Sequence, residues 1–269
     1  RVERIRGGGG KVRGTNRKEW GKGTGRKGGL PDGGGKSSIG RTRPSGGRNW
    51  EIVFVATIER VWSELPGMSD RQIAILDCAA RVFGARGFAG ADVQIIADEA
   101  GVGKGTVYRQ FGTKDELFLA TVDREIHMMA AGLVMMSDAQ PSPMDALETA
   151  VRGFLEFFDE RPWAAELIIL ERANFRDREE STFIKYKERF RNYWEGLVVR
   201  LMESGALREV SPKDTFELFS DALYGAMFTN HVAGHREPYV SKADAILNGL
   251  LRGLLSDTGA DRVGSLGEF

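Results

Sequence analysis

Apolar residues recur at steps of three and four along most of the chain after residue 68, which is the period of an amphipathic α-helix. The three most regular stripes are Ile75, Ala79, Val82 and Phe83; Leu147, Val151, Phe154, Leu155 and Phe158; and Phe183, Tyr186, Phe190, Trp194, Leu197 and Leu201. No stretch alternates convincingly between apolar and polar residues, as a half-buried strand does. The pattern predicts an all-α fold with about nine helices after Met68 and no internal repeat.

Helix-starting signals divide this region into separate helices. N-cap residues that are followed by an acidic residue within three positions are Ser69, Thr113, Ser142, Ser211 and Ser241. Proline at the next position strengthens the signals at Ser142 and Ser211, because it suits the first turn of a helix. Gly87 and Gly205 stand where the preceding helices should end.

Residues 1–67 differ from the rest in composition and charge. They hold 17 of the 35 glycines and carry 15 Lys/Arg against 6 Asp/Glu, so their net charge is +9 and that of the remainder is −9. A basic, glycine-rich sequence cannot bury enough apolar surface to offset the entropy of ordering. We therefore expect this segment to be disordered, apart from a short helix over 51–65.

Met68 is the first methionine of the chain and directly precedes the cap at Ser69. We hypothesise that translation starts at Met68 and that residues 1–67 are upstream sequence. The alternative is a genuine basic tail that adds non-specific affinity for nucleic acid.

The most informative stretch is 91–111, which reads ADVQIIADEAGVGKGTVYRQF. Asp92 can cap a short helix, and Gly101 can take the positive φ that a tight turn needs. A second short helix is predicted from about Lys104 to Phe111. Two short helices joined by a glycine turn form a helix-turn-helix, whose second helix enters the major groove of DNA.

The side chains of this second helix are of the types that contact DNA. Its cations can reach phosphates or guanine edges, its hydroxyl groups can bond the DNA backbone, and glycine permits close approach. A lysine at the start of the next helix adds its charge to an N-terminus that favours anions. The residues predicted to contact DNA are Lys104, Gly105, Thr106, Tyr108, Arg109 and Lys114.

Residues 71–124 resemble the DNA-binding domain of TetR/AcrR-family transcriptional regulators. The matching pieces are ILDCAARVFGARGF, the ADVQIIADEAGVGKGTVYRQF core and the following FGTKDELF. Two positions depart from the family pattern: Gly103 and Asp92 stand where Ser or Thr is usual, and Asp92 brings a negative charge near a phosphate.

The resemblance implies the domain organisation. It implies a three-helix DNA-binding domain over 69–129, with its helix-turn-helix at 92–111, and a helical ligand-binding and dimerisation domain over 141–256. A flexible tail follows over 257–269.

The resemblance also implies a homodimer that binds a palindromic operator in double-stranded DNA, usually as a repressor, and releases it when a small molecule binds. The family's dimer interface is formed by the last two helices, here about 212–232 and 242–256. The interface residues expected on this basis are Phe216, Phe219, Leu223, Met227, Leu247, Leu250, Leu251 and Leu254. The alternative for each stripe is the core of a single protomer.

A ligand pocket is predicted among the aromatic residues of the middle helices. The candidate lining residues are Trp163, Leu167, Phe183, Tyr186, Phe190 and Trp194, with Met128, Met129 and Met135 as an adaptable wall. Because this set is apolar, it favours an apolar or aromatic effector. The alternative is that these residues only pack the core.

Other functions are disfavoured by what the sequence lacks. The single cysteine cannot form an internal disulfide, and His231 and His235 show no obvious acidic or sulfur partner for a metal. We see no clustered catalytic set, no cofactor motif and no apolar run of the length that a membrane span needs, about 18 residues. We therefore expect a cytoplasmic protein that is not an enzyme and binds no metal or cofactor. The alternatives are a nucleic-acid-coating protein acting through its basic tail, and a helical small-molecule-binding protein or enzyme.

Overall fold

The computed structural model describes residues 67–234 and 237–253, which lie within one compact unit. Five sequence predictions lie outside these residues: the state of residues 1–66, the short helix over 51–65, the tail over 257–269 and the positions of Leu254 and His235. The described part contains ten α-helices, one short 3₁₀ helix and no strand, so the all-α prediction is confirmed. No helix in this part is both long and apolar enough to cross a membrane.

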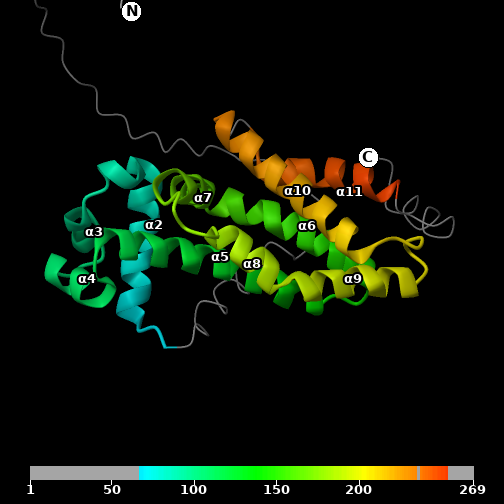
Figure 1. Cartoon of the computed structure of the whole chain (residues 1–269), viewed down its shortest axis with the longest axis horizontal. Helices are drawn as coiled ribbons and strands as arrows, with labels where there is room; N and C mark the ends of the chain where they lie inside the picture. The colour runs from blue at the N-terminus through cyan, green and yellow to red at the C-terminus, as the bar shows by residue number, and fades with distance from the viewer. Residues whose placement is uncertain (1–66, 235–236, 254–269) are drawn as a thin grey trace, which may run out of the picture. The chain divides into compact units, whose positions relative to one another are not determined.

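The helices follow one another with short connections (Figure 1). Their bounds are α2 (Asp70–Gly90), α3 (Val93–Glu99), α4 (Lys104–Phe111), α5 (Lys114–Asp138), α6 (Pro143–Glu160), α7 (Pro162–Asn174), α8 (Thr182–Arg189), α9 (Arg191–Glu203), α10 (Pro212–Val232), η1 (Tyr239–Lys242) and α11 (Ala243–Leu251). The described helices exceed the expected nine by one, because the stripe from Phe183 to Leu201 belongs to two helices. Phe190 separates them with non-helical backbone angles (φ −101°, ψ 4°).

Caps start most of these helices where the sequence predicted. Ser69 and Gln72 form a reciprocal capping box on α2, and Thr113 and Glu116 form another on α5. The hydroxyls of Ser142 and Ser211 accept hydrogen bonds from backbone N–H groups in the first turns of α6 and α10.

Ser241 does not cap α11 as expected. Its hydroxyl donates to the Pro238 carbonyl, and the helix begins after Lys242 without a side-chain cap. The preceding 3₁₀ turn is held instead by Asp159, whose carboxylate accepts from the N–H groups of Tyr239 (2.7 Å) and Val240 (2.9 Å). A distant carboxylate has therefore replaced the local cap.

Glycine shapes α2 at two points. Gly87 has φ +68° and ψ 170°, so helical geometry breaks there and a short final turn continues to Gly90. At Gly84, a β-carbon would lie 2.4 Å from Cβ of Trp163, so only glycine allows α2 to pack this closely against α7.

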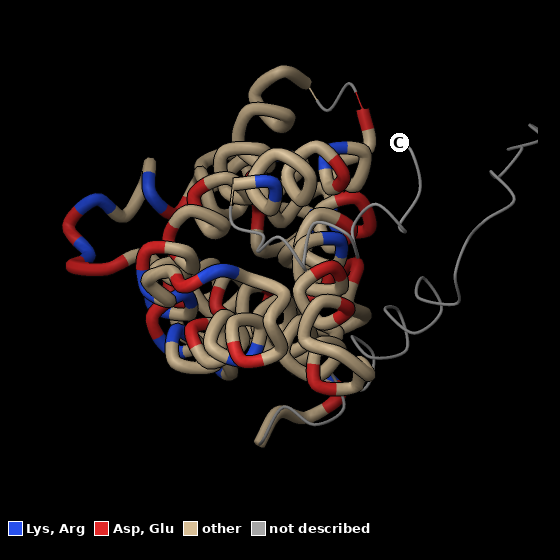
Figure 2. Tube along the Cα trace, turned by 90° about the vertical axis from the view of Figure 1, so that its right-hand side faces the viewer, with Lys and Arg blue, Asp and Glu red and all other residues tan. Residues whose placement is uncertain are grey.

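Lys/Arg and Asp/Glu are interspersed along the helices seen from the α9 end (Figure 2).

A buried ionic cluster joins α2, α5 and the start of α7. Glu125 on α5 is 1% exposed and accepts from Arg161 (3.2 Å) and from the indole N–H of Trp163 (3.3 Å). The neighbouring Arg124 pairs with Asp77 of α2 at 2.9 Å and with Glu125 at 3.4 Å. Each charge faces an opposite one, which offsets part of the cost of taking these groups out of water, but burial still raises the pKa values of Glu125 and Asp77.

Candidate nucleic-acid interface and ligand cavity

The α3–α4 segment has the helix-turn-helix geometry that the sequence predicted. Asp92 caps α3 by accepting from the Gln94 N–H at 2.8 Å. Gly101 takes φ +65° in the turn, and the Val102 N–H closes it on the Ala97 carbonyl at 2.9 Å. The second helix, α4, then covers residues 104–111, as expected.

One face of α4 is fixed in the core and the other faces solvent. Val107 is 1% exposed and Phe111 is half-buried against the same core. Tyr108 is 42% exposed and Arg109 is also exposed. The remaining predicted contacts on α4 are accessible too: Gly105 is exposed, whereas Lys104 and Thr106 are half-buried. The geometry therefore leaves a polar, cationic face of α4 open to a partner.

Asp92 holds one of these cations. Its carboxylate lies 3.1 Å from Lys104 Nζ and also accepts the capping bond from Gln94. The Gln94 bond and then the Lys104 bond lower the pKa of Asp92 below its ordinary value. Asp92 is therefore ionised at neutral pH and offsets the charge of Lys104.

Lys114 lies in the first turn of α5, beside the end of α2. Its ammonium donates to the Ala89 carbonyl at 3.3 Å and lies 5.0 Å from the centre of the Phe88 ring. An ammonium has three N–H donors, so this placement leaves capacity for a phosphate next to the α5 N-terminus. Hydrogen bonds from the Thr113 N–H and hydroxyl keep the pKa of Glu116 low and the adjoining cap formed.

Lys114 packs on Phe88, which belongs to an aromatic cluster that the sequence analysis did not predict. Phe88 contacts Phe118 of α5, and both rings contact Phe175, which directly follows α7. The ring centres are 5.1–5.4 Å apart. Phe175 carries no local signal of this role, because only the tertiary fold brings the end of α7 to this place.

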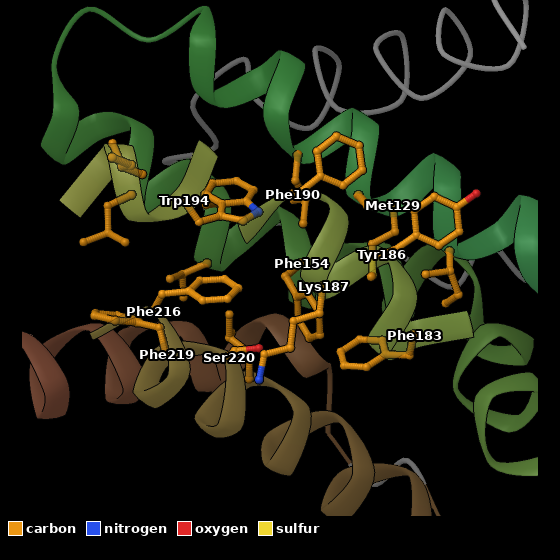
Figure 3. A pocket seen from close by; sticks show the side chains of 18 of the residues that line it. Met129, Phe154, Phe183, Tyr186, Lys187, Phe190, Trp194, Phe216, Phe219 and Ser220 are labelled. Atoms are coloured by element: carbon orange, nitrogen blue, oxygen red, sulfur yellow. The ribbon is translucent and has the colours of Figure 1, made fainter. Parts of the chain in front are cut away.

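A cavity of about 120 Å³ lies among α5, α6, α8, α9 and α10 (Figure 3). Four of the six predicted pocket residues line it, namely Phe183, Tyr186, Phe190 and Trp194. The rest of the lining comprises Ile126, Met129, Ala130, Leu133, Leu147, Ala150, Val151, Phe154, Lys187, Leu197, Val198, Phe216, Phe219, Ser220 and Leu223. Most of the wall is therefore hydrocarbon or aromatic.

Trp163 and Leu167 do not line this cavity, because α7 packs against α2 and α5. The Trp163 indole belongs to the ionic cluster around Glu125, and Leu167 is 1% exposed in the core. Of the three candidate methionines, Met129 reaches the cavity, whereas Met128 and Met135 are absent from its lining.

The apolar stripe of α10 faces its own protomer. Phe216, Phe219 and Leu223 line the cavity, and Met227 is fully buried. On α11, Leu247 and Leu251 are buried as well, and Leu250 is half-buried. These residues therefore contact the interior of their own protomer, and their place in a dimer interface stays a prediction. The apolar side chains that α10 exposes are Leu218 (47%), Phe228 (41%) and Val232 (66%).

Tyr186 connects the cavity wall to α5. Its hydroxyl donates to Asp123 at 3.0 Å, and its ring centre lies 5.5 Å from that of His127. Burial and the Asp123 carboxylate raise the pKa of Tyr186, and burial lowers the pKa of His127. Both groups are therefore uncharged at neutral pH, which keeps this side of the cavity apolar.

His231 has an acidic neighbour that the sequence did not reveal. Its Nε2 lies 2.7 Å from a carboxylate oxygen of Glu166 on α7. His235 lies outside the described residues. Within the described part, no group of three or more His, Cys, Asp or Glu side chains is placed to hold a metal ion.

Residues 75–121 match the family model described as bacterial regulatory proteins, tetR family. The HTH-type transcriptional activator FasR of Mycolicibacterium smegmatis is 31% identical over 120 residues, which are 45% of this chain and 49% of the relative. EthR, an HTH-type transcriptional regulator of the same organism, is 26% identical over 145 residues, 54% of this chain and 61% of the relative. The chain thus spans between about half and three fifths of the length of these curated relatives.

Solved structures share the fold. The structure of the transcriptional regulator FadR from Bacillus subtilis, in complex with stearoyl-CoA, superposes with a TM-score of 0.57. The alignment covers 67% of this chain and 98% of that one, at 16% sequence identity. The segment that holds the helix-turn-helix therefore matches the tetR family of bacterial regulatory proteins, and the chain is similar to regulators of this kind through that segment and the helices around it.

Proposed function

We propose that the chain is a ligand-responsive, sequence-specific DNA-binding regulator of transcription that acts as a homodimer. The observation that carries the proposal is the polar face of α4, which stands free beyond the Gly101 turn while Val107 anchors the opposite face. Residues 69–129 would form the DNA-binding domain and residues 141–256 the ligand-binding and dimerisation domain.

In this proposal α4 lies in the major groove. Arg109 reaches a guanine edge or a phosphate, Tyr108 and Thr106 bond the backbone, and Lys114 binds a phosphate at the α5 N-terminus. A symmetric dimer presents two copies of α4, which have to lie about 34–36 Å apart to enter successive major grooves of one duplex. The operator is therefore expected to be palindromic.

The proposal is tested by selecting binding sites from a random pool of duplex DNA with the full chain. We expect an inverted repeat whose half-sites are centred about one helical turn apart, roughly 10 base pairs. A pool that stays random after repeated rounds, or enrichment of single-stranded sequence, would refute sequence-specific recognition by this helix.

The dimer is proposed to form through the outward face of α10, together with α11. Leu218, Phe228 and Val232 give this face an apolar character that a single protomer leaves in solvent. This set is proposed alongside the interface residues first expected on α10, which also contact the interior of their own protomer.

Introducing charge on this face should produce monomers. We expect Phe228→Glu combined with Val232→Glu to halve the mass measured by light scattering during size-exclusion chromatography, since buried carboxylates without partners oppose association. Ile184→Glu on α8, which replaces a residue of similar exposure (41%), is the matched control and should leave the dimer intact. A double variant that remains dimeric would place the interface elsewhere.

The ligand is proposed to be an apolar or aromatic molecule that enters the cavity and lowers the affinity for DNA. A cavity of 150 Å³ can hold benzene, so a larger molecule has to push apart the helices around the smaller cavity found here. Tyr186 ties this wall to α5, and α5 carries Lys114 at its start. Ligand binding would thus favour an arrangement of α5 that fits the operator less well. The protein acts as a repressor where its operator overlaps a promoter.

Removing the carboxylate of Asp92 should strengthen DNA binding. Asp92→Ser keeps an N-cap on α3 but frees Lys104 from its ion pair and removes a negative charge near the phosphates. We expect affinity for the selected site to rise about three- to tenfold and the salt dependence to steepen by the equivalent of about one phosphate contact, measured by fluorescence anisotropy. Asp98→Ser, at an exposed aspartate near the end of α3, is the control. Equal affinity of Asp92→Ser and the unmodified chain would contradict the proposed position of Lys104.

A further inference from the structure

The polar atoms of the cavity wall differ in whether they already have partners. Four lining residues carry side-chain nitrogen or oxygen, namely Tyr186, Lys187, Trp194 and Ser220. The Tyr186 hydroxyl is engaged with Asp123 and points away from the centre of the cavity (Figure 3). Among the described residues, Ser220 Oγ and the Trp194 indole N–H have no hydrogen-bond partner. Both groups are therefore open to a ligand: the Ser220 hydroxyl can donate or accept a hydrogen bond, whereas the indole N–H can only donate.

The Lys187 ammonium is not available to a ligand in the same way. It binds Glu217 of α10 and lies 3.7 Å from Asp221, the two carboxylates that flank Ser220 along that helix. Glu217 also accepts from Arg191 at 2.6 Å. What Lys187 offers to the cavity is its hydrocarbon stem, since its charge is already satisfied.

The charges beside Ser220 sum to a negative value. Arg191 contacts Glu188 and Glu195 in addition to Glu217. The cluster thus contains two cations, Lys187 and Arg191, and four carboxylates. Hydrogen bonds from Arg191 and Lys187 hold the pKa values of Glu188 and Glu217 below their ordinary range, so both carboxylates are ionised at neutral pH. An anionic ligand group near Ser220 would be repelled, and a cationic one would have to leave water for a largely apolar wall beside carboxylates that already have cationic partners.

The opposite side of the cavity does not supply a charge either. Lys185 and Arg189 contact the ring of Tyr186, but neither belongs to the cavity lining. Lys185 is moreover paired with Asp123 at 2.8 Å.

We propose that the cavity selects an uncharged apolar or aromatic molecule that carries a carbonyl oxygen, and that this oxygen accepts a hydrogen bond from Ser220 Oγ. The inference rests on the proposed function, because it identifies the ligand class of the same regulatory cavity. Ser220 is the specificity-determining residue, and the acidic cluster around Lys187 rejects carboxylates.

Three aromatic molecules of eight carbons separate these effects: acetophenone, which has a neutral carbonyl, phenylacetate, which is an anion, and ethylbenzene, which has no polar atom. Isothermal titration at pH 7 with the full chain should show acetophenone binding at least about tenfold more tightly than phenylacetate. Ser220→Ala should weaken the binding of acetophenone about two- to tenfold, the range for one hydrogen bond. The affinity for ethylbenzene should change less than twofold. Thr229→Ala, on α10 but outside the cavity, is the control and should leave the affinities for all three molecules unchanged.

The ranking on the unmodified chain tests the inference even without a variant. Phenylacetate binding as tightly as acetophenone, equal losses of acetophenone and ethylbenzene in Ser220→Ala, or binding of none of the three would each overturn it. Selection of DNA from the random pool by the same preparation separates the two proposals. DNA binding without this ranking removes only the ligand inference, whereas the ranking without DNA binding removes only the regulatory function.

Discussion

Replacing Arg109 and Lys114 together with alanine is expected to lower affinity for the selected DNA site by at least about hundredfold. Arg109 is exposed on the free face of α4, and Lys114 stands at the α5 N-terminus with donor capacity beyond its bond to Ala89. Contacts of this kind contribute about 1–3 kcal/mol each when they reach a base edge, and phosphate contacts also set the salt dependence. The plot of log affinity against log salt should therefore become shallower by about one to two phosphate contacts.

Fluorescence anisotropy with the selected duplex at several salt concentrations measures both quantities. The matched control is Arg172→Ala combined with Arg176→Ala, which also removes two exposed cations but from the region where α7 ends. The control should bind DNA within about threefold of the unmodified chain. Unchanged affinity of the Arg109/Lys114 variant, with its helical content intact by circular dichroism, would contradict the assignment of the DNA-binding face.

Glu125→Leu should destabilise the protein by about 3–5 kcal/mol, the range for removing one partner of a buried ion pair. The carboxylate lies between Arg124 and Arg161 and also accepts from the Trp163 indole. Leucine has a similar volume but offers no hydrogen-bond acceptor to the arginines or to the Trp163 indole N–H at this buried position. Asp77 still faces Arg124, so the loss falls mainly on Arg161 and Trp163.

Denaturant unfolding followed by circular dichroism gives this free energy, and the melting temperature should fall by about 6–20 °C. Glu148→Gln is the control, because Glu148 pairs with Arg152 in a half-exposed position and such pairs contribute about 1 kcal/mol or less. A loss below about 1 kcal/mol for Glu125→Leu would mean that water or neighbouring groups compensate the arginines, and that the cluster does not hold α2 to α7.

The helix-turn-helix could be predicted from the sequence because its determinants are local. Asp92 caps α3 through a residue two positions away, and Gly101 supplies the positive φ of the turn. Val107 and Phe111 then fix which side of α4 faces the core. The cap, the turn and the buried face each depend on residues that are close in the sequence, so the bounds of α4 agree with the expected ones.

The cavity and the α10 face depend on tertiary structure, and sequence reasoning was less successful there. Helical spacing identifies a buried stripe, but it does not say whether the same protomer or a partner buries it. Phe216, Phe219 and Leu223 are cases in which the protomer itself does so. Trp163 likewise belongs to a buried ionic cluster, because its indole meets a carboxylate that is distant in the sequence.

Methylation interference on the selected duplex tests most directly whether α4 reads the major groove. Dimethyl sulfate methylates guanine N7 in the major groove and adenine N3 in the minor groove. A duplex with a guanine at the centre of each half-site therefore reports whether the protein needs the major groove there. We predict that N7 methylation at two positions about 10 base pairs apart prevents binding, whereas N3 methylation between them does not. Interference restricted to adenine N3, or the same N7 pattern in the Arg109/Lys114 variant, would contradict the account.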